Sequence, residues 1–239
     1  MKIKFKHSEN KHTVEGAKAA LTKIFGNKVP KTVLDVGCGV GTWLKACQEL
    51  GAKEVQGIDG VKIPKNQLLI DNCKFTAKDL TKPIDLKKKY ALVLCLEVGE
   101  HLQENDSNTL IEGLTRHSNT ILFSAACPGQ KGQNHINCQW PSFWQKKFNN
   151  YGFACFDTIR KKIWDNQIIE PWYRQNIFLA KKSKKAGKEK RISPLKHPEI
   201  FPNANADNDE KIKRLKRKLK EIAYHLKHII YAILRKENK

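Results

Sequence analysis

Short apolar runs alternate with segments of helical periodicity from residue 13 to about residue 182. Apolar runs of about four to eight residues are typical of buried strands. Because parallel strands need helical crossovers, the alternation predicts an α/β fold with a Rossmann-like, doubly wound and mostly parallel sheet of seven strands. The expected strands are 32–36, 54–59, 73–76, 90–97, 119–125, 153–159 and 176–182, and the expected helices are 13–25, 42–50, 107–117 and 141–150.

The pattern changes at Lys181, where the chain becomes polar, basic and rich in proline. We therefore expect one globular domain over residues 1–182 and a basic flexible linker over residues 183–208. An amphipathic helix with heptad spacing is expected over residues 209–237. Its apolar positions follow one another by three and four residues: Ile212, Leu215, Leu219, Ile222, Leu226, Ile229 and Ile233.

Charge is concentrated in this tail. The formal net charge is +21, and residues 181–239 carry 19 Lys and Arg against 7 Asp and Glu, which is more than half of the excess. A basic amphipathic helix can lie on an anionic membrane, pair as a short coiled coil, hold nucleic acid or pack back on its own domain. We favour the membrane surface or self-association, with nucleic acid as the second choice.

The seven cysteines are scattered, and no two of them have the C-x-x-C spacing of a zinc or redox motif. Such usage indicates reduced thiols in a cytosol-like compartment. We therefore expect a cytoplasmic protein, with peripheral attachment to the inner face of a membrane as a role for the tail.

The stretch VLDVGCGVGTWL, residues 33–44, places three glycines directly after the first expected strand. Glycines there can take positive φ angles and let a ligand touch the backbone, or they can simply form a tight turn. The spacing G-x-G-x-G is not the dinucleotide fingerprint G-x-G-x-x-G, and no Gly-Lys-Ser/Thr follows as a P-loop requires. Asp35 would repel a pyrophosphate but could accept a hydrogen bond from a cationic group. Asp59 stands where an acid can bind both hydroxyls of a ribose, so the two acids favour a nucleoside without phosphates that carries an ammonium group.

With these residues the chain resembles class I S-adenosylmethionine-dependent methyltransferases over roughly residues 13–182. VLDVGCGVG, GIDG, Asp79-Leu80 and CLEVGEHL carry the resemblance, in the expected order. It implies S-adenosyl-L-methionine as the cofactor and S-adenosyl-L-homocysteine as the product. The residues implied to bind them are Asp35, Gly37, Cys38, Gly39 and Gly41 on the methionine side, Asp59 at the ribose, Asp79 and Leu80 at the adenine, and Glu97 at the border of the cofactor.

Two later segments, PGQKGQNHINCQWPSFW and IWDNQIIEPWYRQN, are more polar and aromatic than packing requires. The pair resembles a compact subset of these methyltransferases associated with surface-glycan synthesis. Asn134-His135 replaces the usual Gly-His of that subset, and Cys138 replaces a common acid. The expected substrate contacts are Asn137, Gln139, Trp140, Trp172, Tyr173 and Arg174.

A hydroxyl acceptor is a poor nucleophile and benefits from a general base. His135 is the first candidate, because a loop histidine with a near-neutral pKa suits that task. His101 is the second candidate, with Glu100 as an orienting or basic partner. Each histidine can instead be a structural hydrogen-bond partner, and Trp140 and Trp172 can instead be core residues. No metal-ligating constellation is visible in the sequence, so no metal is expected.

The sequence therefore predicts an O-methyltransferase that acts on a hydroxyl of a carbohydrate or a related surface-glycan precursor. An RNA ribose methyltransferase with the basic tail as its handle is the alternative. The Asn/Asp-Pro-Pro-Tyr/Phe motif of amino-methylating nucleic-acid enzymes is absent, and Leu96-Glu97-Val98-Gly99 stands in its place. A third possibility is a non-catalytic module that binds the cofactor or a partner.

Overall fold

The chain forms two units, Met1–Leu195 and Lys196–Lys239. A computed structural model describes Phe5 and residues 12–26, 28–202, 214–219, 222–223 and 226. The first unit contains every strand and the candidate site. Residues 214–219 of the second unit are helical, and Leu215 and Leu219 are exposed there. Most of the helix expected over residues 209–237 lies outside the described residues.

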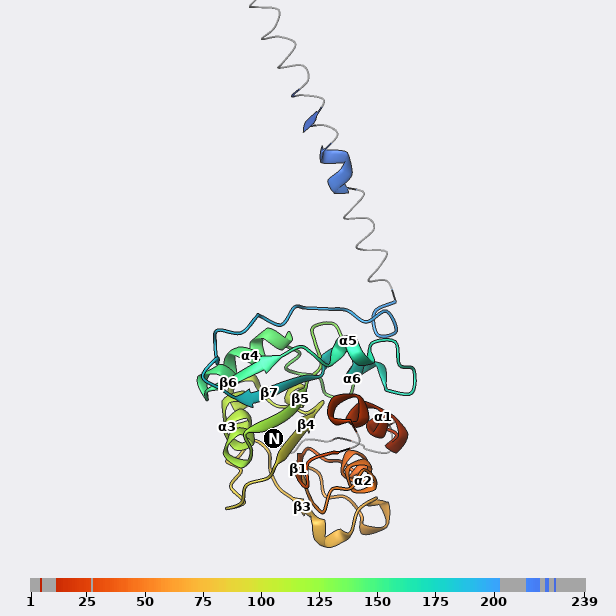
Figure 1. Cartoon of the computed structure of the whole chain (residues 1–239), viewed down its shortest axis with the longest axis vertical. Coiled ribbons are helices and arrows are strands. Elements are labelled where there is room, and N and C mark those ends of the chain that lie inside the picture. The colour runs from red at the N-terminus through yellow and green to blue at the C-terminus, as the bar shows by residue number, and fades with distance from the viewer. Residues whose placement is uncertain are drawn as a thin grey trace, which may run out of the picture. The chain divides into compact units, whose positions relative to one another are not determined.

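Seven strands form a single sheet in the first unit (Figure 1). They are β1 (Thr32–Val36), β2 (Glu54–Asp59), β3 (Phe75–Ala77), β4 (Leu92–Leu96), β5 (Thr120–Ser124), β6 (Phe153–Phe156) and β7 (Phe178–Lys182). Their order is β3-β2-β1-β4-β5-β7-β6. Strands β1 to β5 pair in parallel, whereas β7 is antiparallel to both β5 and β6. The predicted Rossmann-like, mostly parallel sheet is confirmed.

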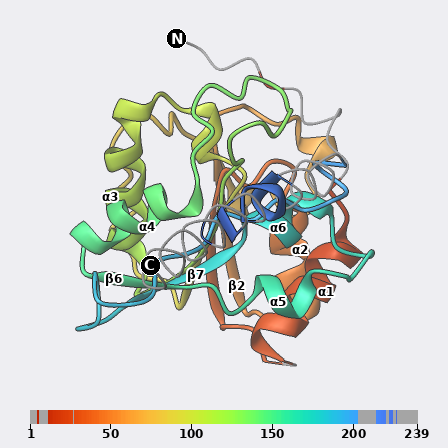
Figure 2. The ribbon, with the colours of Figure 1, turned by 90° about the horizontal axis from the view of Figure 1, so that it is seen from above.

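Helices cover both faces of this sheet, as Figures 1 and 2 show. Helices α3 (Ser107–His117) and α4 (Pro141–Asn150) lie on one face. The other face carries α1 (Val14–Phe25), α2 (Thr42–Glu49), α5 (Arg160–Ile163) and α6 (Pro171–Asn176). The described residues also form the short 3-10 helices η2 (Lys65–Gln67), η3 (Asn72–Lys74), η4 (Gly99–His101) and η5 (Glu104–Asp106).

The side chains of β4 show why the sheet is buried on both sides. Leu92, Leu94 and Leu96 pack in the core under α1 and α2, whereas Val93 and Cys95 pack in the core under α3 and α4. Because successive side chains of a strand point to opposite faces, a continuous apolar run serves two cores at once. The uninterrupted run LVLCL is the sequence sign of such a central strand.

Residues 153–182 differ most from the expected elements. Strand β6 ends at Phe156, and the chain then forms the short helices α5 and α6, which sequence periodicity did not predict. Pro171 begins α6 at a position where its missing N–H costs nothing. Each of these helices is too short to display a clear period of 3.6 residues.

The predicted flexible linker also differs from the structure in its first part, because the compact unit extends to Leu195 instead of ending at residue 182. Ile192 is buried in the core beside α4. The Glu189 carboxylate accepts hydrogen bonds from the side-chain amides of Gln145 and Asn149 and from the Cys155 N–H. One buried isoleucine and one acceptor carboxylate thus hold an otherwise basic segment against the domain.

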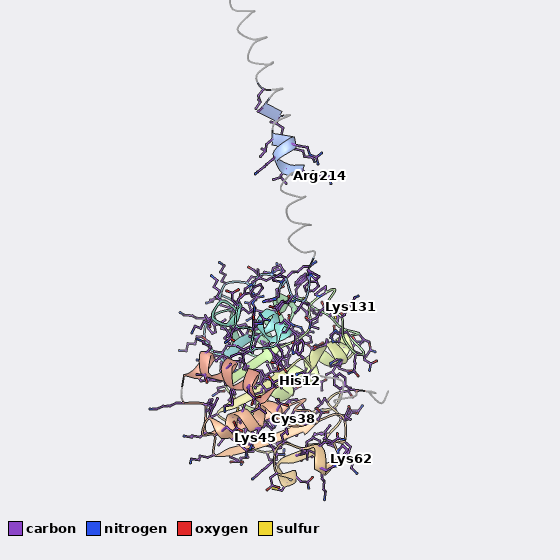
Figure 3. The ribbon with its side chains drawn as sticks, turned by 90° about the vertical axis from the view of Figure 1, so that its right-hand side faces the viewer. His12, Cys38, Lys45, Lys62, Lys131 and Arg214 are labelled. Carbon is purple, nitrogen blue, oxygen red and sulfur yellow. The ribbon has the colours of Figure 1, made fainter. Side chains whose placement is uncertain are left out.

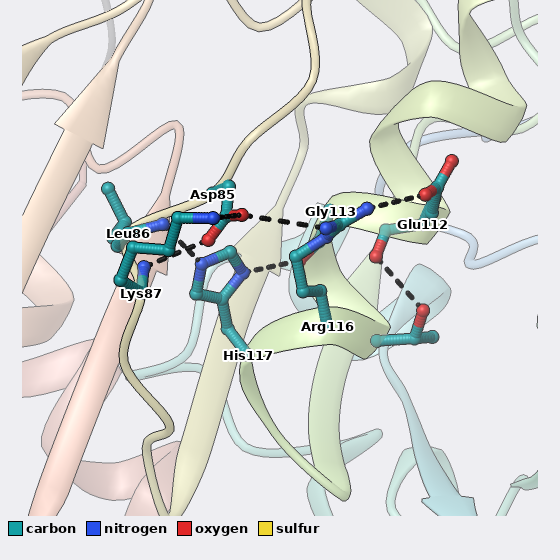
Figure 4. A network of polar contacts seen from close by, with 8 residues as sticks. Asp85, Leu86, Lys87, Glu112, Gly113, Arg116 and His117 are labelled. Carbon is teal, nitrogen blue, oxygen red and sulfur yellow. Dashed lines mark hydrogen bonds and ion pairs between the residues drawn. The ribbon is translucent and has the colours of Figure 1, made fainter.

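The end of α3 is fixed by a buried histidine (Figure 4). His117 is 1% exposed; its Nδ1 donates to the Gly113 carbonyl over 2.6 Å, and its Nε2 accepts from the Leu86 N–H over 2.9 Å. These partners require the neutral imidazole, and burial lowers the pKa of His117. Around it, Asp85 pairs with Lys87 and Arg116 on the exposed side.

All seven cysteines are free thiols, in agreement with the expectation of reduced cysteines. Within the described ranges, we find no helix whose length and apolar character would let it cross a membrane.

Candidate active site

A cavity of about 390 Å³ opens where β1 and β4 end. A smaller cavity of about 60 Å³ adjoins it, since Phe5, Gly37, Glu97 and His101 line both. In an open α/β sheet this carboxyl edge is where ligands bind. His12, Cys38 and Lys131, which line the larger cavity, are labelled in Figure 3.

The glycine loop that follows β1 forms one wall of the larger cavity. Gly37 has φ of 82°, and a Cβ on it would lie 2.2 Å from Cγ2 of Val98. Both the backbone angle and the space therefore require glycine at this position. The N–H groups of Gly37 and Cys38 donate to the Ile58 carbonyl, which joins the loop to β2. The same wall includes Cys38 and Gly39. The Gly41 N–H donates to the Cys38 carbonyl and closes the turn of the loop.

Asp35 and Asp59 lie at the base of this loop, and both are almost fully buried. The Asp59 carboxylate accepts a 2.8 Å hydrogen bond from the Gly39 N–H and another of 2.8 Å from the Val61 N–H. Burial raises the pKa of Asp35 well above its usual value, and the charge of Asp59 raises it further. A cationic ligand group would stabilise the ionised Asp35, so the pair fits a nucleoside with an ammonium group.

The two residues expected at the adenine are placed differently. Leu80 is buried and lines the smaller cavity beside Asp59. Asp79 is exposed, and its Oδ1 accepts from the Thr81 N–H and hydroxyl, which lowers the pKa of Asp79. Asp79 therefore stabilises the turn after β3. Of the two residues, only Leu80 lines a cavity, where it offers an apolar surface.

Glu97 directly follows β4 and has φ of 56°, a backbone angle that costs energy for a residue with a side chain. Its carboxylate accepts from the side-chain amides of Asn176 and Gln130. Burial raises the pKa of Glu97, while these hydrogen bonds act in the opposite direction. Three elements distant in sequence thus meet at one carboxylate on the border of the cavity.

The catalytic candidates lie together at the other wall. The ring centroids of His101 and His135 are 5.2 Å apart. Glu100 is fully buried beside them, and both burial and the neighbouring Glu97 raise its pKa well above the usual value. Burial and the nearby His135 lower the pKa of His101 to about 4, and burial also lowers the pKa of His135. Two neutral imidazoles therefore face the cavity at physiological pH.

The expected substrate contacts divide into two groups. Trp172 and Tyr173 line the larger cavity, and the Tyr173 hydroxyl lies 2.9 Å from Nδ1 of His12. The other four residues line neither cavity in the described part of the chain and support the fold instead. Asn137 donates to the Gly99 carbonyl, Gln139 contacts Glu104, Trp140 precedes α4 as its N-cap, and the buried Arg174 donates to the Trp164 carbonyl.

Sequence reasoning missed several lining residues, among them Phe5, His12, Trp43, Gln130 and Gln133. Trp43 directly follows the glycine loop and packs edge-on against Tyr173, with ring centroids 4.9 Å apart. Its position after the motif was a usable signal. Phe5 and His12 precede the first helix, and no local pattern there indicates a contact with the sheet edge.

The cavity has two ends. The glycine-loop end comprises Asp35, the loop 37–41 and Asp59. The histidine end comprises Glu100, His101, His135, Trp172 and Tyr173.

The chain matches the family Methyltransf_23, described as a methyltransferase domain, over residues 10–160. This match spans more than half of the chain, so the protein belongs to that methyltransferase family and is an S-adenosylmethionine-dependent methyltransferase. No curated protein matches the sequence with significance.

Solved structures share the fold. Magnesium protoporphyrin IX methyltransferase from Synechocystis PCC 6803 with bound S-adenosylhomocysteine is 20% identical, with a TM-score of 0.52 over 71% of this chain and 82% of that chain. The methyltransferase domain of bacterial CtHen1-CN is 16% identical, with a TM-score of 0.50 over 71% and 100%. These identities show the common fold. The match to the methyltransferase family, together with the glycine loop at the end of β1, identifies S-adenosylmethionine as the methyl donor.

Proposed function

We propose that the protein is an O-methyltransferase whose acceptor is a hydroxyl of a carbohydrate or a related surface-glycan precursor. The observation that carries the proposal is the histidine end: two imidazoles, of His101 and His135, lie close together and line the same cavity as the glycine loop. A neutral imidazole accepts a hydroxyl proton, as a general base must. Trp172, which lines the same cavity next to His12 and Tyr173, offers an aromatic surface on which a sugar ring can stack.

S-adenosylmethionine supplies an electrophilic methyl group: the bond from sulfur to this carbon breaks with its electrons kept by sulfur, and the acceptor oxygen bonds to the carbon. The protein orients the acceptor oxygen, and positioning of this kind supplies a large part of the acceleration of a displacement. His135 takes the hydroxyl proton, with His101 beside it as the second base. Their separation of 5.2 Å between ring centroids lets one hydroxyl reach both rings.

Transfer of labelled methyl from S-adenosylmethionine into a lysate of the source cells tests the proposal. The lysate is then fractionated into glycan, RNA, protein and small molecules. Label in glycan or in a nucleotide sugar supports it. Label in RNase-sensitive material favours the ribose alternative, in which the lysines after β7 and the tail hold the substrate. No label, while S-adenosylhomocysteine still binds, leaves a cofactor-binding module.

The tail belongs to the same proposal, as a peripheral anchor on an anionic membrane or as a self-association helix. Exposed Leu215 and Leu219 and the basic residues between them support it. Flotation with anionic vesicles and light scattering separate the two roles. If removal of residues 196–239 changes neither vesicle binding nor molar mass, the tail has neither role.

A further inference from the structure

We propose that Glu100, His101 and His135 form a binding site for a divalent transition-metal ion at the histidine end of the cavity. One ligand atom from each residue lies within 4.8 Å of the other two. Glu100 and His101 are adjacent in η4, and His135 reaches them from the loop after β5. Residues from two separate segments thus converge on one point of the cavity wall.

Glu100 is the first argument for a cation. The residue is 0% exposed, and in the described part of the chain neither carboxylate oxygen has a hydrogen-bond partner. The N–H groups of Glu100 and Ala126 and the carboxylate of Glu97 lie nearby without meeting hydrogen-bond geometry, and a cation would also offset the repulsion between the two carboxylates. A buried carboxylate without partners is costly, and a coordinated cation removes that cost.

The two histidines supply the second argument. Nδ1 of His135 lies 3.0 Å from the Gln130 carbonyl, and Nδ1 of His101 lies 3.4 Å from the Asn134 carbonyl. A proton on each Nδ1 follows from these contacts, which leaves the lone pair on each Nε2. Histidine ligands in metalloproteins are oriented in the same way, by donating the other ring N–H to a carbonyl or a carboxylate.

Backbone contacts hold the loop that carries His135 against η4. The Ile136 and Asn137 N–H groups donate to the Glu100 carbonyl over 2.9 and 3.0 Å, which ties the His135 segment to η4. Gly132 makes room for the ring, because a Cβ there would lie 2.1 Å from Nε2 of His135. The backbone therefore fixes the third ligand beside the first two.

The ligand set selects the class of ion. Two imidazoles and one carboxylate suit Mn²⁺, Fe²⁺, Co²⁺ or Zn²⁺, whereas Mg²⁺ and Ca²⁺ prefer oxygen ligands alone. With bonds of about 2.1 Å, two ligand atoms on one ion are at most about 4.2 Å apart. The ligand atoms lie within 4.8 Å of one another, so a small rotation of the side chains would bring them to distances that one ion can bridge. Three protein ligands leave coordination positions open toward the cavity.

The role of the ion rests on the proposed function. An acceptor hydroxyl bound to the ion would be more acidic and would lose its proton more readily. With the ion bound, the imidazole lone pairs would hold the ion, whereas in the ion-free protein His135 takes the proton. Binding of the ion, by contrast, is measured without any acceptor.

The experiment is titration of the full chain with manganese chloride, followed by electron paramagnetic resonance and by calorimetry, after removal of metals. We expect one Mn²⁺ per chain, with competition by Zn²⁺. Glu100→Gln and His135→Ala should weaken binding about 100-fold or more, since loss of an outer partner alone typically costs 10–100-fold. Gly132→Ala keeps all three ligands but displaces the His135 ring, so it should also weaken binding.

Matched controls remove the same chemistry elsewhere. Glu104→Gln changes an exposed carboxylate in the neighbouring η5, and the double variant His225→Ala with His228→Ala removes two imidazoles of the tail. Both should bind Mn²⁺ as the native chain does. Binding of S-adenosylhomocysteine by each variant shows that it is folded. If Glu100→Gln does not fold, His135→Ala and Gly132→Ala decide the matter.

The outcomes separate the two proposals. Absence of stoichiometric Mn²⁺ binding, or binding that the three site variants leave unchanged, overturns the ion site. Metal-independent methyl transfer together with no binding overturns the ion site and leaves the proposed function intact. Stoichiometric binding that is lost in the variants supports the site, even if no hydroxyl acceptor becomes labelled and the proposed function fails.

Discussion

The two ends of the cavity are built from different kinds of structure. The glycine-loop end comes from the ends of β1 and β2, whose strands pair directly from Thr32 with Glu54 to Val36 with Ile58. The histidine end comes from η4, the loop after β5 and α6, which the sheet does not pair with one another. One end is therefore set by strand register, and the other by side-chain and backbone contacts between loops.

This difference separates what the family shares from what each member recognises. Glycines at a strand end can be specified by a short local motif, because register places them. Loops positioned by a rigid scaffold are where specificity commonly resides. The fold and the methyl donor thus follow from the glycine-loop end, and the acceptor has to be inferred from the histidine end.

The largest effect is expected at the histidine end. His135→Ala should lower methyl transfer by about 10²- to 10⁴-fold, the usual contribution of a general acid or base. Binding of S-adenosylhomocysteine, measured by calorimetry, should remain within about twofold, because the glycine-loop end is untouched. Loss of cofactor binding together with activity would show that the two ends are not independent.

At the glycine-loop end, Asp59→Ala should weaken S-adenosylhomocysteine binding about 100-fold, because charge-assisted hydrogen bonds contribute about 1.5–3 kcal/mol. The change removes the acceptor of the Gly39 N–H and the carboxylate that we expect to bind the ribose hydroxyls. Asp79→Ala is the matched control; its carboxylate faces solvent and Thr81, so we expect less than about a threefold change. Equal losses in both variants would place Asp79 at the cofactor as well.

The same difference between the two ends explains which features of the fold and the site could be predicted from the sequence. The apolar runs predicted the sheet, and the glycine motif predicted that Asp35, Gly37 and Asp59 lie at its ligand-binding edge. Both predictions were possible because the periodicity of a strand and the motif at its end are local properties of the sequence. Trp172 and Arg174 stand two positions apart in WYRQN, and the sequence suggested both as substrate contacts, yet of these two only Trp172 lines the cavity. Their fates depend on how the short helix α6 packs, which no local pattern encodes. The grouping of Glu100, His101 and His135 could not be predicted for the same reason, because His135 is distant in sequence from the other two residues.

A change outside both ends should affect stability alone. His117→Ala leaves the Leu86 N–H without its acceptor in the core and removes the side-chain donor to the Gly113 carbonyl, which should cost about 1–3 kcal/mol. Urea unfolding measures this loss. Under conditions in which the variant is fully folded, its affinity for the cofactor should be unchanged. An unaltered free energy of unfolding would mean that water replaces the imidazole.

His117 also gives the stability a defined pH dependence. Its folded pKa lies below the unfolded value of 6.5, so between these values only the unfolded chain binds the proton. Its stabilisation is therefore complete above about pH 7 and falls as the pH decreases through 6.5 toward the folded pKa. Comparing urea midpoints of the native chain and His117→Ala at pH 7.5 and 5.5 isolates this contribution. A difference between the two chains that does not shrink at pH 5.5 would contradict it.

The smallest effect is expected for Gln139→Ala, which tests where the acceptor surface ends. Gln139 contacts Glu104 and Asn137 rather than the cavity, so the acceptor KM should change by less than about twofold and the stability by about 0.5 kcal/mol or less. Trp172→Ala, at the cavity wall, should raise the KM of the same labelled acceptor about fivefold or more through lost stacking. If both variants raise KM equally, the acceptor extends along the loop after β5 and the histidine end is larger than the cavity shows.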